Sequence, residues 1–466
     1  MLNGQAVASA ISRGLTRRQI LKSASAGFGY LALAGLLGEN APRVAAADRP
    51  AAPGPLVPRQ PHFRARAKRI IFLFMEGAMS QMDTLEYKAQ LQRDDGQEAP
   101  GGATLTASRF RFRQHGQTGT WVSDLFPNVA RHVDKFCFIR GLHTDTPAHP
   151  QAVIQLHTGT ALAQLTRPSL GSWLLYGLGT ENQDLPGYVT INPSPNFGGA
   201  VNYGSAFLPA HFQGTRVNDN GDMANLRAAT TPRLQRRQLD LIQSMNRDLA
   251  RTPGAPDQVE GVIESYELAF RMQERVPELL DLAREPRSVL DLYGVRPGPA
   301  GSFARQCLMA RRLSEAGVRF VEITQSGWDH HNGLHQGLIR QAGMVDQPTA
   351  ALLTDLERRG LLEETLVLFG SEFGRMPTAQ GPDGRDHNIT GYPMWLAGAG
   401  VRKGFSYGRT DEYGLNAVEG RMHTTDLHAT LLALLGLDHQ QLTYRYAGRD
   451  FRLTDVAGNV VTEIFA

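Results

Sequence analysis

The stretch Arg69-Ile70-Ile71-Phe72-Leu73-Phe74-Met75-Glu76-Gly77 decides the fold class of this chain. Apolar residues fill it from Ile70 to Met75, with no alternating polar position, which is typical of a strand buried on both faces. A strand of this kind, followed at once by a polar loop, commonly opens a doubly wound sheet. The stretch therefore predicts an α/β domain.

Similar strand-forming runs recur along the chain, at residues 136–140, 188–191, 319–323, 365–370 and 393–396. Helical patterns lie between them. One example is the spacing of Leu352, Leu353 and Leu356 before a stop at Arg359-Gly360. Strands that alternate with helices predict a central, mostly parallel sheet flanked by helices.

The pattern changes between about residues 217 and 295. Ile242, Met245 and Leu249 recur at helical spacing, and a second periodic run follows from Val259 to Tyr266. Charged residues fill the positions between. We expect a helical hairpin inserted into an α/β domain of residues 68–466, with a structural role as a cap.

The N-terminus carries the most specific local signal. Thr16-Arg17-Arg18-Gln19-Ile20-Leu21-Lys22 is a twin-arginine motif, and a mildly apolar stretch from 23 to 37 follows it. Ala45-Ala46-Ala47 supplies a signal-peptidase pattern, so we expect a signal peptide over 1–47 and a linker over 48–67. The protein is then a client of the twin-arginine export machinery, is periplasmic or secreted, and has no stable membrane span after cleavage. An uncleaved N-terminal anchor is the alternative.

Charge and cysteine content narrow the class of protein. Residues 1–47 carry five basic residues and one acidic residue, a net charge of +4, which leaves −1 for the rest of a 466-residue chain whose total is +3. Nucleic acid is therefore not an expected partner, because the working domain lacks basic excess. With two cysteines, Cys137 and Cys307, the chain is no disulfide-stapled miniprotein, and whether the two pair stays open.

Polar chemistry gathers in the loops that follow the expected strands. Because the carboxyl ends of parallel strands meet at one edge of a sheet, side chains in these loops approach one another. Five segments carry carboxylates, imidazoles or both, namely 76–84, 143–150, 327–335, 371–375 and 384–388. These are the ligands of zinc, manganese and other divalent ions. The sequence predicts one or two bound divalent ions, with zinc, manganese and calcium as candidates.

Asp329, His331 and His387 are the first candidate ligands. Glu372 and Glu76 come next, and His335 and His330 compete with His331 for the same place. Bound metal polarises a phosphate or sulfate ester and neutralises charge on the leaving oxygen.

Two arginines and two small polar residues complete the expected site. Arg375 and Arg385 are expected to hold the remaining oxygens of an anionic substrate through paired hydrogen bonds. Ser80 and Asp83 either line the site or cap the following helix.

The polar motifs together resemble a widespread bacterial family of exported proteins, domain of unknown function 1501. The matching motifs are Gly-Ala-Met-Ser-Gln-Met-Asp-Thr at 77–84, Gly-Trp-Asp-His-His at 327–331, Ser-Glu-Phe-Gly-Arg-Met-Pro at 371–377, Gly-Arg-Asp-His-Asn at 384–388, Asp-Leu-His-Ala-Thr at 426–430 and Gly-Arg-Asp-Phe-Arg-Leu-Thr at 448–454. They cover nearly all of the chain beyond the leader. The family in turn resembles the alkaline phosphatase and sulfatase superfamily, which implies a two-metal hydrolase site on a parallel sheet.

This resemblance assigns roles to six positions. Glu76 falls at the first metal-binding carboxylate, and His149 at the nucleophile that begins a helix. Asp329, with His331 or His335, matches a ligand pair after a middle strand, while Glu372 and His387 match later ligands. Two positions depart from the superfamily pattern: His149 replaces a hydroxyl or thiol, and Phe373 replaces a ligand histidine.

Two functions of different class follow. The first is an exported metal-dependent hydrolase of sulfate or phosphate esters, whose substrate is an anionic ester or glycan. His149, Ser80 or metal-bound water attacks, and Arg375 and the metal stabilise the developing negative charge. The second is a degenerate member of the superfamily that binds an anionic glycan or a partner protein without turnover.

Overall fold

A computed structural model describes residues 56–99, 102–162, 166–218, 220–223, 226, 230–250, 258–296 and 301–466. The expected signal peptide and the first part of the expected linker lie outside these residues. Within that linker, residues 56–67 are hydrogen-bonded along the body of the domain. Arg59 N–H donates to Leu178 O at 2.9 Å and Phe63 N–H to Gly436 O at 3.2 Å.

A nine-stranded sheet forms the centre of the domain, in the order β12-β4-β11-β8-β1-β7-β5-β6, with β15 paired to β4. Its strands are β1 (Arg69–Glu76), β4 (Phe136–His143), β5 (Tyr188–Ile191), β6 (Thr215–Val217), β7 (Phe320–Ser326), β8 (Thr365–Gly370), β11 (Tyr392–Gly398), β12 (Phe405–Tyr407) and β15 (Met422–His423). All pairings are parallel except those of β11, which runs antiparallel to both β4 and β8. The predicted α/β class and mostly parallel sheet are confirmed.

Strand β1 is central, and every one of its residues is buried. It pairs in parallel with β7 on one side, where Ile70 faces Phe320, and with β8 on the other, where Ile70 faces Leu366. A strand in the centre of a sheet that helices cover on both faces has no solvent-exposed face, which explains the continuous apolar run. The carboxyl ends of β1, β7 and β8 consequently open at the same edge.

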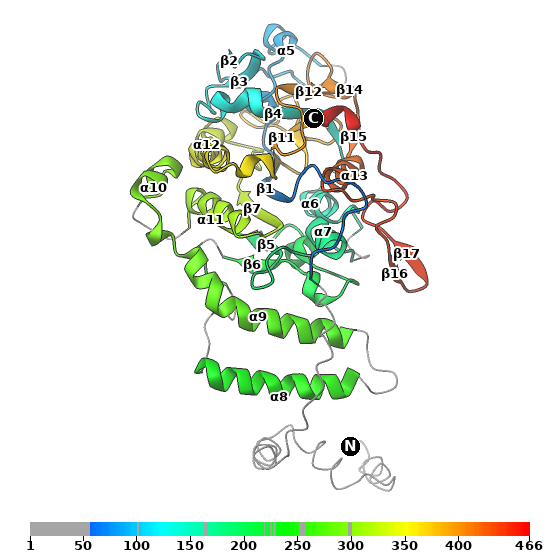
Figure 1. The fold of residues 1–466 in the computed structure, drawn as a ribbon. Coiled ribbons are helices and arrows are strands. Elements are labelled where there is room, and N and C mark those ends of the chain that lie inside the picture. The colour runs from blue at the N-terminus through cyan, green and yellow to red at the C-terminus, as the bar shows by residue number, and fades with distance from the viewer. Residues whose placement is uncertain are drawn as a thin grey trace, which may run out of the picture. The chain divides into compact units, whose positions relative to one another are not determined.

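Helices cover both faces of the sheet (Figure 1). They are α6 (His149–Thr158), α7 (Leu170–Leu178), α11 (Phe303–Glu315), α12 (Leu334–Arg358) and α13 (Thr424–Leu434). In Figure 1, α11 and α12 lie on one side of β1 and β7, and α6, α7 and α13 on the other. Helix α12 is 25 residues long and begins well before the periodic leucines that predicted its end.

Two long helices, α8 (Pro232–Ala250) and α9 (Gln258–Leu280), lie side by side within the segment 217–295 (Figure 1). Gln243 Nε2 donates to Ile263 O at 2.7 Å, and Arg236 pairs with Glu267 through both terminal nitrogens at 2.7 and 2.8 Å. A shorter helix, α10 (Arg287–Tyr293), follows.

The remaining elements are short. They are α4 (Gln81–Thr84), α5 (Ala89–Arg93), β2 (Phe112–His115), β3 (Thr120–Ser123), β9 (Gly374–Arg375), β10 (His387–Asn388), β13 (Arg409–Thr410), β14 (Ala417–Glu419), β16 (Tyr444–Tyr446) and β17 (Arg449–Phe451), with 3-10 turns at Val129–Lys135, Gly199–Tyr203, Ala210–Phe212, Leu282–Arg284, Leu361–Glu363 and Thr462–Ile464. Cys137 and Cys307 are both free and buried. Within the described ranges, no helix combines the length and apolar character that a bilayer crossing requires.

Candidate metal centre

The candidate site lies at the edge where the parallel strands end. Glu76 is the last residue of β1, and Glu372 follows β8 by two residues. Asp329 and His331 lie in the connection from β7 to α12, and His387 is on β10. His149 is the first residue of α6, the helix that follows β4. Residues from five parts of the sequence therefore meet at one place, as strand-end chemistry predicts.

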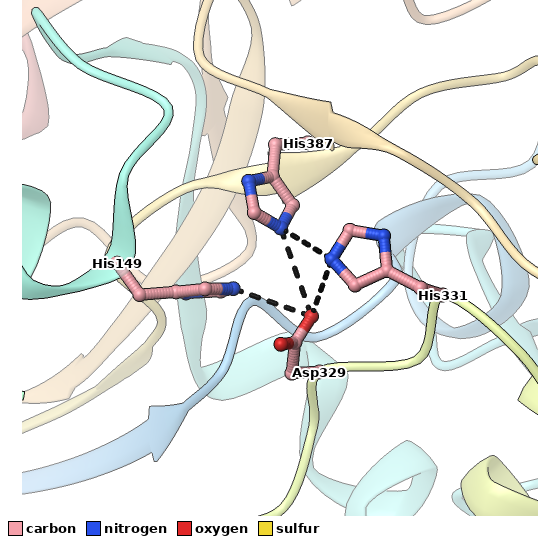
Figure 2. A group of neighbouring side chains, drawn as sticks. All are labelled: His149, Asp329, His331 and His387. Carbon is pink, nitrogen blue, oxygen red and sulfur yellow. Dashed lines mark hydrogen bonds and ion pairs between the residues drawn. The ribbon is translucent and has the colours of Figure 1, made fainter. Parts of the chain in front are cut away.

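Four side chains converge at this edge: His149, Asp329, His331 and His387. One ligand atom from each lies within 4.8 Å of all the others. Figure 2 shows the three imidazole rings directed at one carboxylate oxygen. Asp329 Oδ1 lies 2.9 Å from His331 Nε2, 3.2 Å from His149 Nε2 and 3.6 Å from His387 Nε2. Metal-bound ligand atoms at about 2 Å from a common ion are about 3–4 Å apart, so the cluster has the right scale.

Each of the three imidazoles is held from its other ring nitrogen by an oxygen. The contacts are His149 Nδ1 with Glu372 Oε1 at 2.6 Å, His387 Nδ1 with Pro147 O at 2.6 Å, and His331 Nδ1 with Gln380 Oε1. Because carboxylate, carbonyl and amide oxygens accept hydrogen bonds, each Nδ1 carries a proton, so Nε2 is the nitrogen that each ring can offer to a metal ion. Hydrogen bonds of this kind orient histidine ligands in metal proteins. The donor set therefore fits a metal ion.

The chemistry of the donors narrows the choice of metal. Three imidazoles and one carboxylate suit zinc, manganese and similar divalent ions. Calcium prefers six to eight oxygen ligands, so its place among the expected ions finds no support in this cluster.

Charges at the centre perturb two of its side chains strongly. Burial lowers the pKa of His149, but hydrogen bonds to Asp329 and Glu372 outweigh it and raise that pKa to about 9. Burial raises the pKa of Asp329, and contacts with His149, His387 and Arg375 more than reverse this, leaving it far below its usual range. With no metal bound, His149 is therefore a cation and Asp329 an anion at neutral pH, and the two form an ion pair at 3.2 Å.

Arg375 is expected to hold substrate oxygens, and in the structure its donors contact protein oxygens instead. Its side chain is completely buried. Nε donates to Ala78 O at 2.9 Å, and the terminal nitrogens donate to Gly77 O at 2.6 Å and to Arg385 O at 3.1 Å. A terminal nitrogen also contacts Asp329 Oδ1 at 2.6 Å. Arg375 thus ties the loop after β1 to the ligand Asp329, which is a positioning role.

Arg385, Asp83 and Ser80 form a separate buried network. Arg385 Nε donates to Asp83 Oδ2 at 2.8 Å, and Ser80 Oγ donates to the same oxygen at 2.6 Å. A terminal nitrogen of Arg385 donates to Met376 O at 3.2 Å. The polar atoms of these three side chains are hydrogen-bonded to one another. This arrangement gives no support to the expected roles of Arg385 and Asp83 in substrate binding or of Ser80 in attack.

The other expected ligands lie outside the cluster of four. Glu76 is buried, and its Oε2 accepts from Ser326 Oγ at 2.5 Å, while burial raises its pKa. His335 stacks on Phe110 with ring centroids 4.7 Å apart. His330 is buried with both ring nitrogens unpartnered among the described residues. The structure thus selects His331 from the three neighbouring histidines.

Three groups that contact the candidate ligands were not predicted from the sequence. Gln380 and the carbonyl of Pro147 orient ligands, and the Phe197 ring lies parallel to His149 with centroids 5.1 Å apart. A backbone carbonyl has no sequence signal, and neither Gln380 nor Phe197 lies in a recognisable motif. Phe373, which replaces an expected ligand, packs against His149 and His387 at 4.8 and 4.7 Å.

Several solved structures have a similar chain trace. A protein in the alkaline phosphatase superfamily from Vibrio parahaemolyticus is 10% identical, with a TM-score of 0.40 over 83% of this chain and 71% of its own. The lipoteichoic acid synthase LtaP from Listeria monocytogenes is 9% identical, with a TM-score of 0.37 over 84% and 76%. The sulfatase PsFucS1 from Pseudoalteromonas sp. is 14% identical, with a TM-score of 0.38 over 86% and 72%.

Sequence comparison assigns the chain to a family. No curated protein matches it significantly. A family model described as "Protein of unknown function (DUF1501)" matches residues 67–465, which is nearly the whole described domain. The resemblance carried by the polar motifs is thereby confirmed, and the chain belongs to the DUF1501 family.

Proposed function

We propose that this protein is an exported, metal-dependent hydrolase of phosphate or sulfate esters. One observation supports this most strongly: three imidazoles, each fixed through Nδ1, direct Nε2 at the Asp329 carboxylate. A purely structural cluster of histidines does not require this uniform orientation. The substrate is an anionic ester or a glycan that carries one.

Asp329, His331 and His387 would hold the ion. When bound, a divalent ion supplies Lewis-acid polarisation of the ester and neutralises charge on its oxygens. That contribution is needed here, since the donors of Arg375 and Arg385 are occupied by protein oxygens.

His149 is the nucleophile in this proposal. His149 first gives the proton on Nε2 to a water molecule, and the free Nε2 attacks the phosphorus or sulfur centre. The bond to the alcohol oxygen breaks, and the alcohol leaves with the proton that this water carries. A second water then cleaves the bond to nitrogen and restores the imidazole. Glu372, 2.6 Å from Nδ1, holds the ring in place and stabilises the positive charge that develops on it. The N-terminus of α6 places a partial positive charge at the same point.

A second candidate function has an observation in its favour. His149 Nε2 belongs to the same cluster of ligand atoms as the other three residues. If all four side chains bind the ion, coordination is complete, as in structural zinc sites that lack an open position. The protein would then bind an anionic glycan or a partner protein without turnover.

Substitution of His149 separates the two. We expect the His149→Ala variant, loaded with zinc or manganese, to keep its metal and to lose hydrolysis of p-nitrophenyl phosphate or p-nitrophenyl sulfate by at least about a hundredfold. Loss of metal from this variant would assign His149 as a ligand and favour the binding function. Absence of turnover by the fully loaded unsubstituted protein on both esters would contradict the hydrolase.

Export is proposed on the twin-arginine motif and the cleavage pattern at Ala45-Ala46-Ala47. Intact mass measurement of the protein from periplasmic extract should show a chain that begins at residue 48. Replacement of Arg17 and Arg18 by lysine should retain the full-length protein in the cytoplasm. Processing that is unaffected by this replacement would contradict the twin-arginine route.

A further inference from the structure

A cavity of about 490 Å³ lies at the ends of β5 and β7 and between α10, α11 and α12. This volume is within the range of small-molecule sites. The side chains that matter for its chemistry are Asn192, Arg296, Gln306, Gln325, Met344 and Gln347. Its lining contains no aspartate or glutamate.

Three of its amide side chains have their NH₂ groups engaged and their oxygens free. Asn192 Nδ2 donates to Thr324 O at 3.3 Å, Gln325 Nε2 to Ser326 O at 3.3 Å, and Gln347 Nε2 to Asp291 O at 3.2 Å. Their amide oxygens receive no hydrogen bond from any described residue. The fourth amide, Gln306, is 3% exposed, and its Oε1 also has no partner among the described residues. Of the four, only Gln306 is buried, and buried polar groups without partners are rare and indicate a missing ligand or water. Asn192 and Gln325 are half-buried and Gln347 is exposed, so their free oxygens are open to a ligand from solvent.

Two residues around the cavity, Gly294 and Asn192, have positive φ angles. Gly294 has φ +75°, and a Cβ at this position would lie 3.0 Å from Gln347 Oε1. A larger residue there would therefore press against the Gln347 side chain. Asn192 has φ +56°, a left-handed conformation that costs free energy outside glycine and that asparagine tolerates better than most residues. Strain of this kind persists at binding sites because the surrounding structure holds it.

The free groups specify the ligand chemistry. Amide oxygens accept hydrogen bonds, so the ligand must carry several donors. A cation is disfavoured, because the lining offers no carboxylate and Arg296 lies exposed at the cavity without an ion-pair partner among the described residues. Met344, 40% exposed, provides an apolar surface. We propose that this cavity binds a sugar ring, whose hydroxyls donate to the amide oxygens and whose C–H face packs on Met344.

The cavity and the metal centre share one edge of the sheet. Gln325 lies in β7, four residues before Asp329, and it donates to Gln341 Oε1 at 3.3 Å. Gln341 Nε2 in turn donates to Gly327 O at 2.9 Å, in the loop that carries Asp329. Sugar binding does not depend on the metal centre. The further step, that the ester substrate is a carbohydrate ester, rests on the proposed function.

The test is a glycan array of neutral gluco-, galacto-, manno- and fuco-oligosaccharides, probed with the mature protein, followed by calorimetric titration of the strongest binder. We expect Gln347→Leu and Gln325→Leu each to weaken binding about tenfold, the loss of one well-formed hydrogen bond. Gln238→Leu, an exposed glutamine on α8, is the matched control and should bind as the unsubstituted protein does.

Asp329→Ala distinguishes failure of this proposal from failure of the proposed hydrolase. Sugar binding should persist in Asp329→Ala even if the protein neither holds metal nor hydrolyses esters. Binding that disappears in Asp329→Ala but survives both glutamine substitutions would assign the sugar to the metal centre and overturn the proposal. So would an array on which no neutral glycan binds.

Discussion

Glu372 connects the loop after β1 to the metal centre. Both of its oxygens lie near Gly77 N, at 2.9 and 3.3 Å, and Oε1 also contacts His149 Nδ1 at 2.6 Å. Glu372→Gln keeps an oxygen for these contacts but removes the negative charge that stabilises the positive charge developing on His149 during attack. We expect hydrolysis of p-nitrophenyl phosphate to fall by about 10–100-fold while metal content stays unchanged. Ester hydrolysis and elemental analysis measure the two effects, with Glu364→Gln at the exposed Lys68 pair as the control. Equal rates in the two variants would contradict this role.

Arg375 is the buried residue whose loss should cost most stability at this site. Removal of its guanidinium leaves the Gly77, Ala78 and Arg385 carbonyls without donors and Asp329 without its closest cation. We expect Arg375→Met to lower the free energy of unfolding by about 3–5 kcal/mol. Urea titration measures the change. Arg409→Met, at an exposed ion pair with Glu419, should leave it nearly unchanged. A small loss for Arg375→Met would return this arginine to the substrate-binding candidates.

At the scale of elements, the turn after β1 sets the position of the Asp329 loop. Gly77 has φ +108°, and a Cβ there would lie 2.6 Å from Asp329 N. We expect Gly77→Ala to displace this loop, to lower metal content and to destabilise the fold by a few kcal/mol. Gly96→Ala is the matched control, since Gly96 has φ +81° but nothing within 4 Å of the added carbon. If both variants behave alike in metal analysis and unfolding, backbone strain and not the close approach to Asp329 explains the loss.

The sequence predicted the elements whose burial pattern is local. Strands β5 and β8 match their predicted bounds, and β1 differs little, because continuous apolar runs reflect burial on both faces. The antiparallel direction of β11 and the short edge strand β6 depend on tertiary pairing, which leaves no local pattern. Helix α12 was predicted only at its leucine-rich end, since its first turns lie among the polar residues of the site loop.

The same division applies to the site. Asp329, His331 and His387 were predicted because ligand-type residues at strand ends gather at one edge. The choice of His331 over His330 and His335 required the structure, because spacing does not fix the direction of a loop side chain. The hydrogen bonds of Arg375 and Arg385 to the protein were not predicted for a similar reason. Whether a guanidinium is free to bind substrate depends on nearby backbone carbonyls, which leave no sequence motif.

At the scale of the whole molecule, buried neutral histidines should limit acid stability. His428 is 1% exposed, and burial outweighs its bond to Leu156 O and lowers its pKa from 6.5 to about 4. Between these values the unfolded chain binds a proton that the folded chain does not, so stability falls as pH falls from 6.5 to 4. One such group costs about 3 kcal/mol over this interval.

Substitution of His428 tests this linkage. Urea unfolding of the unsubstituted protein and of His428→Gln at pH 7 and pH 4 should show a smaller acid loss in the variant. The comparison concerns the change with pH, so a constant cost of the substitution does not affect it. Identical changes in the two proteins would show that His428 does not titrate as its burial implies.

The central claim is that Asp329, His331 and His387 bind a metal ion beside His149, and elemental analysis tests it most directly. Inductively coupled plasma mass spectrometry of the purified mature protein should find about one equivalent of zinc or manganese, since the cluster has the ligands of one ion. Asp329→Ala and His387→Ala should both lose it, while His335→Ala, outside the cluster, should keep it. Protein that holds no divalent metal after reloading, or metal content unchanged in both ligand variants, would contradict the account.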